Sequence, residues 1–312
     1  MASIPFKQEM SFTYGEVTVM SPLIRRVICN NPSAFTFTGT GTYLVGTGDV
    51  AVIDPGPLNE AHIDAICNAL GPDERISHIL ITHTHADHSP AARPLQQRCN
   101  APIYGYAVEA HTEQMAAPAV GDPIQLDEEH DTDYAPDIIL KDGDRIATDQ
   151  WDIEVIHTPG HMANHLCFAL INEKTLFTGD HVMGWSTSIV APPEGNMFAY
   201  MQSLDRLLAR DDQRYLPTHG PAIDNPQEFV RAYIAHRRAR EAQIIDQLAQ
   251  GVHRIGDMVP RLYTEIDPRL FPAAALSVFA HMEDLMTRKR VVCQSGRGLD
   301  GHYLLTEESA YR

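Results

Sequence analysis

The most constraining stretch of this chain is an apolar run that leads directly into metal-binding side chains. Residues 76–82 (Ile-Ser-His-Ile-Leu-Ile-Thr) have the composition of a buried strand. Four ligand-type side chains follow within six residues: His83, His85, Asp87 and His88. Imidazole nitrogens and carboxylates are the ligands that a divalent ion such as zinc prefers. The sequence therefore predicts a metal site at the end of a strand, where Ser89-Pro90 can begin a helix.

Four more segments carry a ligand-type side chain beside a glycine or proline turn. They are Asp54 before Pro55-Gly56, His161 in His-Thr-Pro-Gly-His, Asp180 in Phe-Thr-Gly-Asp, and His219 in Leu-Pro-Thr-His-Gly. Together with the His-x-His-x-Asp-His stretch, this order over about the first 220 residues resembles the metallo-β-lactamase-fold hydrolases. The resemblance implies a mixed α/β (α+β) fold, a four-layered αββα sandwich with the metals at one edge.

The resemblance also implies how the side chains are shared between two divalent ions. One ion would be held by His83, His85 and His161, the other by Asp87, His88 and His219, with Asp180 bridging the two. Zinc is the expected metal, with manganese or iron as alternatives. A hydroxide shared by the ions would attack a carbonyl or phosphoryl centre, and Asp87 would help to orient it. Asp54 would accept a hydrogen bond from a ligand imidazole, or else cap a turn at the end of its strand.

Other histidines need separate roles. His78 and His157 are expected to pack or to form hydrogen bonds. His165, four residues after His161, is a catalytic candidate that would contact the substrate, either donating a proton or binding an anionic group. His130 matches no motif and is expected at the surface.

Residues 1–225 are expected to form the catalytic domain. A hairpin is predicted over residues 42–53 and a helix over residues 59–70, ahead of the ligand strand. Residues 122–137 contain seven acidic residues and no Lys or Arg. That segment is interpreted as a solvated loop, with a substrate-facing lip that repels anions as the alternative.

Residues 226–312 are expected to form a second, winged-helix-like domain. A long helix is predicted over 227–250, shorter helices over 255–263 and 273–286, and a β-hairpin over 290–305. Three helices followed by a hairpin is the order of a winged helix. It resembles the C-terminal domain of the β-lactamase-like protein 2 subgroup.

Few side chains of this region are suited to nucleic acid. The helix over 273–286 is expected to expose His281, Glu283 and Asp284, which are poor groups for a phosphate-lined groove. The arginines of the long helix are expected away from its apolar side: Arg231, Arg237, Arg238 and Arg240. We expect the winged helix to serve in packing, in a homodimer contact or as a substrate lid.

Charge and cysteine usage restrict the partners and the compartment. The formal net charge is -17, with -18 in residues 1–225 and +1 in residues 226–312. An acidic catalytic half disfavours a polyanion. The five cysteines are scattered, and no stretch is long and apolar enough to span a membrane. These features favour a cytoplasmic protein without a membrane partner.

Three functions follow. The first is hydrolysis of a small ester, thioester or lactone, with a small-molecule acyl substrate as the partner. The second is a metal-dependent endoribonuclease acting on single-stranded RNA, an activity known in the β-lactamase-like protein 2 subgroup. The third is a regulatory protein that binds nucleic acid through the winged helix. A dedicated β-lactamase is not expected, because such enzymes usually carry Cys or Ser where Asp180 stands; weak promiscuous β-lactamase activity is left open.

Overall fold

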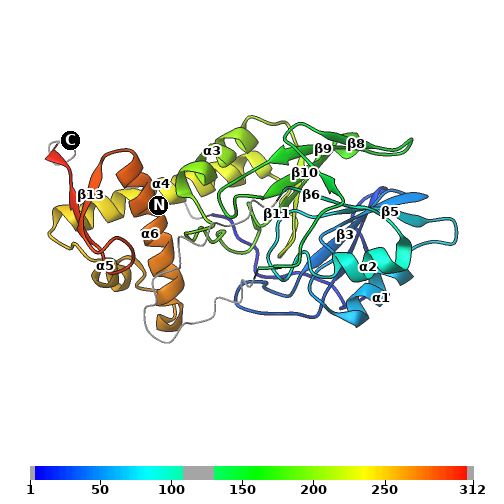
Figure 1. Cartoon of the computed structure of the whole chain (residues 1–312), viewed down its shortest axis with the longest axis horizontal. Helices are drawn as coiled ribbons and strands as arrows, with labels where there is room; N and C mark the ends of the chain where they lie inside the picture. The colour runs from blue at the N-terminus through cyan, green and yellow to red at the C-terminus, as the bar shows by residue number, and fades with distance from the viewer. Residues whose placement is uncertain (1–3, 108–129, 308–312) are drawn as a thin grey trace.

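Two β-sheets packed face to face form the centre of the protein (Figure 1). The computed structural model describes residues 4–107 and 130–307. The first sheet has the order β1 (Thr18–Val19), β2 (Ile24–Ile28), β3 (Gly41–Val45), β4 (Asp49–Ile53), β5 (Arg75–Leu80), β6 (Ile103–Gly105), β7 (Ile138–Ile139). The second has the order β12 (Arg214–Pro217), β11 (Thr175–Gly179), β10 (Leu166–Leu170), β9 (Asp152–His157), β8 (Arg145–Ala147).

Each sheet is covered on its outer face by helices. α1 (Glu60–Asn68) and α2 (Ala92–Cys99) pack on the first sheet, and α3 (Met197–Leu208) and the first half of α4 (Pro226–Ala249) pack on the second. A separate apolar cluster, which includes Tyr43 and Phe168, fills the space between the sheets. Strands β3, β10 and β11 are buried at every position because both of their faces are covered. The predicted four-layered αββα sandwich is confirmed.

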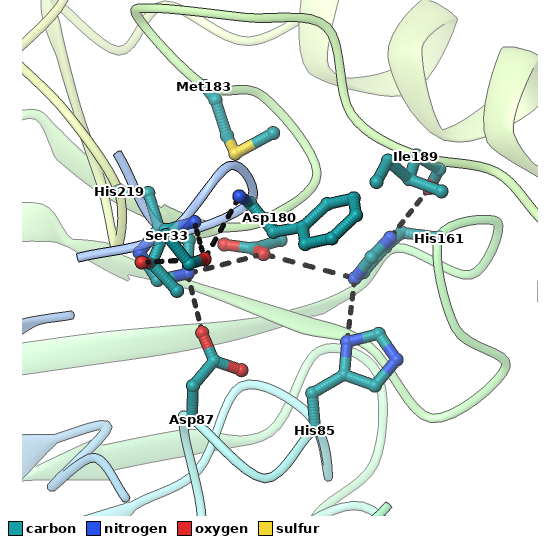
Figure 2. Close-up of a pocket in the computed structure, with 10 residues that line it drawn as sticks. Ser33, His85, Asp87, His161, Asp180, Met183, Ile189 and His219 are labelled. Atoms are coloured by element: carbon teal, nitrogen blue, oxygen red, sulfur yellow. Dashed lines mark hydrogen bonds and ion pairs between the residues drawn. The ribbon is translucent and has the colours of Figure 1, made fainter. Parts of the chain in front are cut away.

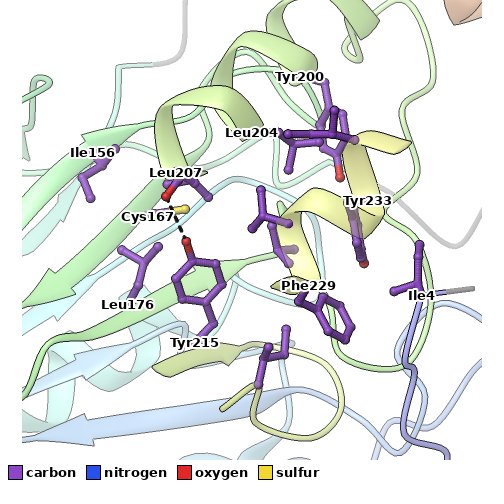
Figure 3. Close-up of a cluster of buried hydrophobic side chains, with 14 of the residues drawn as sticks. Ile4, Ile156, Cys167, Leu176, Tyr200, Leu204, Leu207, Tyr215, Phe229 and Tyr233 are labelled. Carbon is purple, nitrogen blue, oxygen red and sulfur yellow. Dashed lines mark hydrogen bonds between the residues drawn. The ribbon is translucent and has the colours of Figure 1, made fainter. Parts of the chain in front are cut away.

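The C-terminal region has its own apolar core. It combines the second half of α4 with α5 (Ile255–Leu262), α6 (Phe271–Thr287) and the hairpin β13 (Val291–Ser295)–β14 (His302–Leu305). The predicted winged helix is confirmed. Figure 3 shows Phe229 and Tyr233 of α4 inside the buried cluster of the second sheet. The expected division at 225/226 thus coincides with the start of a helix that contributes to both cores.

Several side chains of the C-terminal helices differ from expectation. Arg237 was expected away from the apolar side of α4, but only 4% of its surface is exposed. His281 and Asp284 of α6 were expected at the surface and are buried. Asp284 pairs with Arg288 at 2.7 Å, whereas Glu283 is partly exposed and pairs with Arg297 at 3.1 Å. These corrections arise because helices pack against α4 and α6 on more than one side.

The acidic segment is described only from residue 130 onward; its residues 122–129 lie outside the described part of the chain. Asp131 accepts a hydrogen bond from Ser89 at 2.7 Å, and Asp137 pairs with Arg93 at 2.9 Å. This part of the segment is therefore tied to the turn after the ligand stretch and to α2. Among the described residues, no helix is long and apolar enough to cross a membrane.

Candidate metal centre

The candidate ligands lie at the ends of the parallel strands β4 and β5. β4 ends at Ile53, and Asp54 then adopts a φ of 50°, a left-handed conformation that is uncommon for a residue other than glycine. The N–H of Asp54 donates to the carbonyl oxygen of Leu80, the last residue of β5, at 3.0 Å. Because parallel strands end at the same edge of a sheet, Asp54 meets the ligand stretch that follows β5.

The buried carboxylate of Asp54 accepts four hydrogen bonds. Oδ1 accepts the backbone N–H of Thr82 at 2.8 Å. Oδ2 accepts the hydroxyls of Thr82 at 2.7 Å and Thr218 at 2.8 Å, and Nδ1–H of His88 at 2.8 Å. One carboxylate thus joins the segment after β5, the turn with His88 and the segment before His219. The resemblance implies a hydrogen bond between Asp54 and a ligand imidazole, and His88 is the imidazole that Asp54 contacts.

Three imidazole rings converge on one side of the site. Nδ1 of His85 lies 3.0 Å from Nε2 of His83 and 3.1 Å from Nε2 of His161. Burial lowers the pKa of each of these histidines, with neighbouring histidines adding to the shift for His83 and His85. The rings are therefore neutral, with lone pairs available to a cation.

A second group lies beside the first. Nε2 of His219 is 2.9 Å from Oδ2 of Asp87, and Nε2 of His88 is 3.5 Å from the same oxygen. Oδ2 of Asp180 lies 3.5 Å from Nε2 of both His88 and His219, and 4.0 Å from Nε2 of His161. Asp180 thus reaches the ligand atoms of both groups. Two of the three-residue groups able to hold an ion are those that the resemblance assigns, His83–His85–His161 and Asp87–His88–His219, and a third joins Asp180 to His83 and His88.

The carboxylates and imidazoles of the second group favour each other's charged forms. Burial alone would raise the pKa of Asp180, but His219 and His88 outweigh it and lower the pKa to about 2. Burial would likewise raise the pKa of Asp87, and His88 and His219 hold it below its usual range. Both carboxylates are therefore ionised.

Two buried atoms of the second group lack a hydrogen-bond partner: Nε2 of His88 and Oδ1 of Asp180. A buried polar atom without a partner is costly, and Nε2 of His88 lies 3.5 Å from a carboxylate oxygen of both Asp87 and Asp180. Three neutral imidazoles, two ionised carboxylates and the imidazoles of His88 and His219, which would release a proton on binding a cation, form a donor set that fits divalent ions.

Backbone carbonyls orient two of the rings. Nδ1–H of His161 donates to the carbonyl oxygen of Ile189 at 2.7 Å, and Nδ1–H of His219 donates to that of Gly39 at 3.2 Å. Each bond holds a proton on Nδ1 and leaves Nε2 as the nitrogen that faces the site.

His165 lies behind the site and does not line the pocket. It is fully buried; Nδ1 is 2.8 Å from Oγ1 of Thr158, and Nε2 accepts the backbone N–H of Asp180 at 3.2 Å. This corrects the expectation that His165 contacts substrate, because both ring nitrogens are already used within the protein. Its contacts instead support the backbone of Asp180.

The remaining histidines of the catalytic half have distinct surroundings. His78 packs against Tyr104 and Trp151, as expected for a packing residue. His157 stacks on Tyr106 at 4.3 Å. His130 is exposed, as expected, yet it pairs with the backbone of His85 in an isolated bridge.

The pocket over the ligands is small and carries no Lys or Arg among its described lining residues. Figure 2 shows Met183 and Ile189 on the side opposite Asp87 and His85. The cavity measures about 30 Å³, and its lining is Ser33, Phe35, Thr36, His85, Asp87, His161, Asp180, Met183, Ile189 and His219. Sequence reasoning missed Phe35, Met183 and Ile189, since they come from loops without a motif and no local signal marks them.

Proteins of similar sequence extend over most of the chain. The beta-lactamase-like protein 2 homolog of Drosophila melanogaster is 32% identical over 283 residues, 86% of this chain and 89% of that protein. The homolog in Caenorhabditis elegans is 31% identical, over 77% of this chain and 76% of that protein. An atrochrysone carboxyl ACP thioesterase, dmxR1, of Cryptosporiopsis sp. (strain 8999) is 30% identical, over 75% of this chain and 66% of that protein.

Structural similarity extends over nearly the whole chain. A beta-lactamase domain protein from Burkholderia ambifaria aligns with a TM-score of 0.76 over 96% of both chains, at 19% identity. Residues 255–298 match the beta-lactamase associated winged helix domain, and residues 36–219 match the metallo-beta-lactamase superfamily. The chain therefore belongs to the metallo-beta-lactamase superfamily, as a metal-dependent hydrolase with a C-terminal winged helix.

Proposed function

We propose that this chain uses two divalent ions, zinc in the first instance, to hydrolyse a small uncharged acyl substrate: an ester, thioester or lactone. The observation that carries the proposal is the lining of the pocket. Its mouth is formed by apolar and hydroxyl side chains such as Phe35, Met183 and Ser33, and no Lys or Arg is among the described lining residues. Such a mouth favours an apolar acyl group over a phosphate or carboxylate.

Two further observations support this class of substrate. A relative that is 30% identical over 75% of the chain is named as a thioesterase, which makes a thioester the first substrate to test. The net charge of -17 disfavours a polyanion such as RNA. The cavity is small, so the bulk of a larger substrate would remain outside it.

The side chains of the site would divide the chemistry as follows. Ions bound by the two ligand groups, with Asp180 between them, would lower the pKa of water and polarise a carbonyl oxygen. The ionised carboxylate of Asp87 faces the cavity and would accept a hydrogen bond from the attacking water. Phe35, Met183 and Ile189 would hold the acyl group and keep bulk water from it.

The winged helix is proposed to pack against the catalytic half, since Ala280 of α6 belongs to the same buried cluster as Leu204 of α3. The cytoplasm is proposed as the compartment, because all five cysteines are free thiols.

The test compares substrates on one metal-loaded preparation. We expect kcat/KM for a short-chain thioester, ester or lactone to exceed that for an unstructured RNA, and to change little between low and moderate salt. Asp180→Ala should abolish turnover, whereas Asp211→Ala, which removes an exposed carboxylate, should not.

RNA cleavage is the outcome that would overturn the substrate class. Cleavage that falls steeply with added salt and is lost in Asp180→Ala, with no acyl substrate turned over, would establish a ribonuclease instead.

A further inference from the structure

One loop joins the candidate metal centre to the long helix α4. It begins at Asp180, carries Met183 and Ile189 of the pocket, and ends before α3. The carbonyl oxygen of Ile189 also accepts the hydrogen bond that orients His161. Any shift of this loop would therefore move Asp180, a pocket wall and the orientation of one ring together.

The backbone of Asp180 is held from both sides. Its N–H donates to Nε2 of His165 at 3.2 Å. Its carbonyl oxygen accepts a hydrogen bond from the hydroxyl of Ser188, which also lies 2.9 Å from the carbonyl oxygen of His181. Ser188 is buried, so water does not compete for these bonds. The carboxylate of Asp180 is thus placed by a clamp on its own main chain.

Two side chains of α4 hold the loop from its far side. The hydroxyl of Tyr233 accepts the N–H of Met183 at 3.1 Å and lies 2.5 Å from the carbonyl oxygen of Ser186. Arg237 donates from Nη2 to the carbonyl oxygen of Ser188. Hydrogen bonds from α4 therefore hold the loop at Ser188, the residue whose hydroxyl donates to the carbonyl oxygen of Asp180.

The guanidinium of Arg237 is built into the protein on its other sides as well. It lies 5.2 Å from the ring centre of Tyr200, whose hydroxyl donates to the carbonyl oxygen of His181 at 2.7 Å. Figure 3 shows Tyr200 and Tyr233 in the same buried cluster. Burying a guanidinium is costly unless its charge and donors are used. Here one donor reaches the loop, and the charge faces an aromatic ring.

We propose that Arg237 is a positioning residue of the hydrolytic site. Through Ser188 it fixes the main chain at residues 180 and 181, and so fixes the carboxylate of Asp180 between the two ligand groups. The inference rests on the proposed metal role of Asp180. It makes the helix at the start of the C-terminal region a part of the catalytic machinery, acting on the site without touching substrate.

The test measures metal affinity separately from turnover. Arg237→Met preserves most of the buried volume and removes the donor. We expect it to weaken binding of zinc by about 10- to 100-fold in competition with a chromophoric chelator. It should lower kcat at saturating zinc while KM changes little, because no substrate contact is removed. Arg238→Met, which changes the exposed neighbour on the same helix, is the matched control and should behave as wild type.

Two further variants test the route through Ser188. Ser188→Ala removes one hydroxyl, and it serves even if Arg237→Met folds poorly. It should reproduce the loss of zinc affinity, and the double variant should be no weaker than the weaker single, because the two residues act in series. Arg237→Lys keeps a donor and should recover part of the affinity and of kcat.

The outcomes separate this inference from the proposed function. Wild-type protein that binds no zinc would reject the metal role of Asp180 itself. Wild-type protein that binds two ions, with Arg237→Met and Ser188→Ala equal to it in zinc affinity and kcat, would reject the positioning role alone. Fully additive losses in the double variant, or a lower melting temperature with unchanged zinc affinity and kcat, would also reject it.

Discussion

Asp54→Asn is the substitution whose effect can be worked out most closely from the structure. The carboxylate of Asp54 accepts hydrogen bonds from Thr82, Thr218 and His88 and thereby holds three segments of the metal centre together. Asparagine is nearly identical in shape and removes the negative charge. The substitution therefore leaves no cavity, and its effect reports on the electrostatic role of this position.

The magnitude follows from the four hydrogen bonds. An asparagine oxygen in place of Oδ2 keeps three of them, while its amide NH₂ replaces Oδ1 and faces the N–H of Thr82. An unpaired buried donor costs about 1–3 kcal/mol. The remaining three bonds lose the charge that makes such bonds roughly twice as strong as neutral ones. Part of this loss is offset because no charge remains buried. We expect the free energy of unfolding of the metal-free protein to fall by about 3 kcal/mol.

Metal affinity should fall as well, because His88 loses the partner that orients its ring. Zinc binding should weaken by about 10- to 100-fold, or about 1.4–2.7 kcal/mol. Urea unfolding of metal-free protein and chelator competition measure the two effects separately. Asp49→Asn is the matched control, since Asp49 lies at the start of the same strand in an exposed pair with Arg75. A free energy of unfolding of Asp54→Asn within about 0.5 kcal/mol of wild type, together with unchanged zinc affinity, would refute the reasoning.

Three other predictions concern single side chains. Asp180→Ala should remove nearly all turnover and lower zinc occupancy, measured by elemental analysis; wild-type turnover with both ions bound would exclude a bridging role. His165→Ala should lower turnover more than zinc content, because it frees the N–H of Asp180 but removes no ligand side chain; proportional losses of both would make it part of the metal site. Burial lowers the pKa of His62 to about 4 from an ordinary 6.5, so between these values the unfolded state binds a proton that the folded state does not. Between pH 7 and pH 5, the free energy of unfolding of metal-free wild type should therefore fall by about 2 kcal/mol more than that of His62→Gln. An equal change for both proteins, measured by urea unfolding at the two pH values, would contradict this.

The ligand-type residues were identifiable before the fold was known because each sits in a short motif at the end of a strand. His83 and His85 follow an apolar run, and Asp180 follows Gly179 at the end of β11. Metal ligands must be imidazoles or carboxylates, so residue type and spacing carry much of the information. The layered fold was predictable because the order of these motifs resembles the metallo-β-lactamase fold, and the apolar strands and amphipathic helices around them agree with it.

Arg237 and His165 were both misplaced by the sequence analysis, for one physical reason. Periodicity describes a single helix face, but Arg237 lies where α4 meets the loop of Ser188, 49 residues earlier in the chain. The position of His165 near His161 suggested contact with substrate, whereas its ring nitrogens bind Thr158 and the backbone of Asp180. Neither contact has a local sequence signal.

The sequence by itself determined the metallo-β-lactamase scaffold, the winged helix and the set of ligand-type side chains. The scaffold and the winged helix followed from the resemblance carried by the order of motifs and elements, and the ligand set followed from the fixed chemistry of a few residue types. The tertiary structure alone decided which side chains line the pocket and which ones support Asp180. Loops with Phe35 and Met183 meet over the ligands only when the two sheets pack, so their contacts depend on distance in space and not on order along the chain.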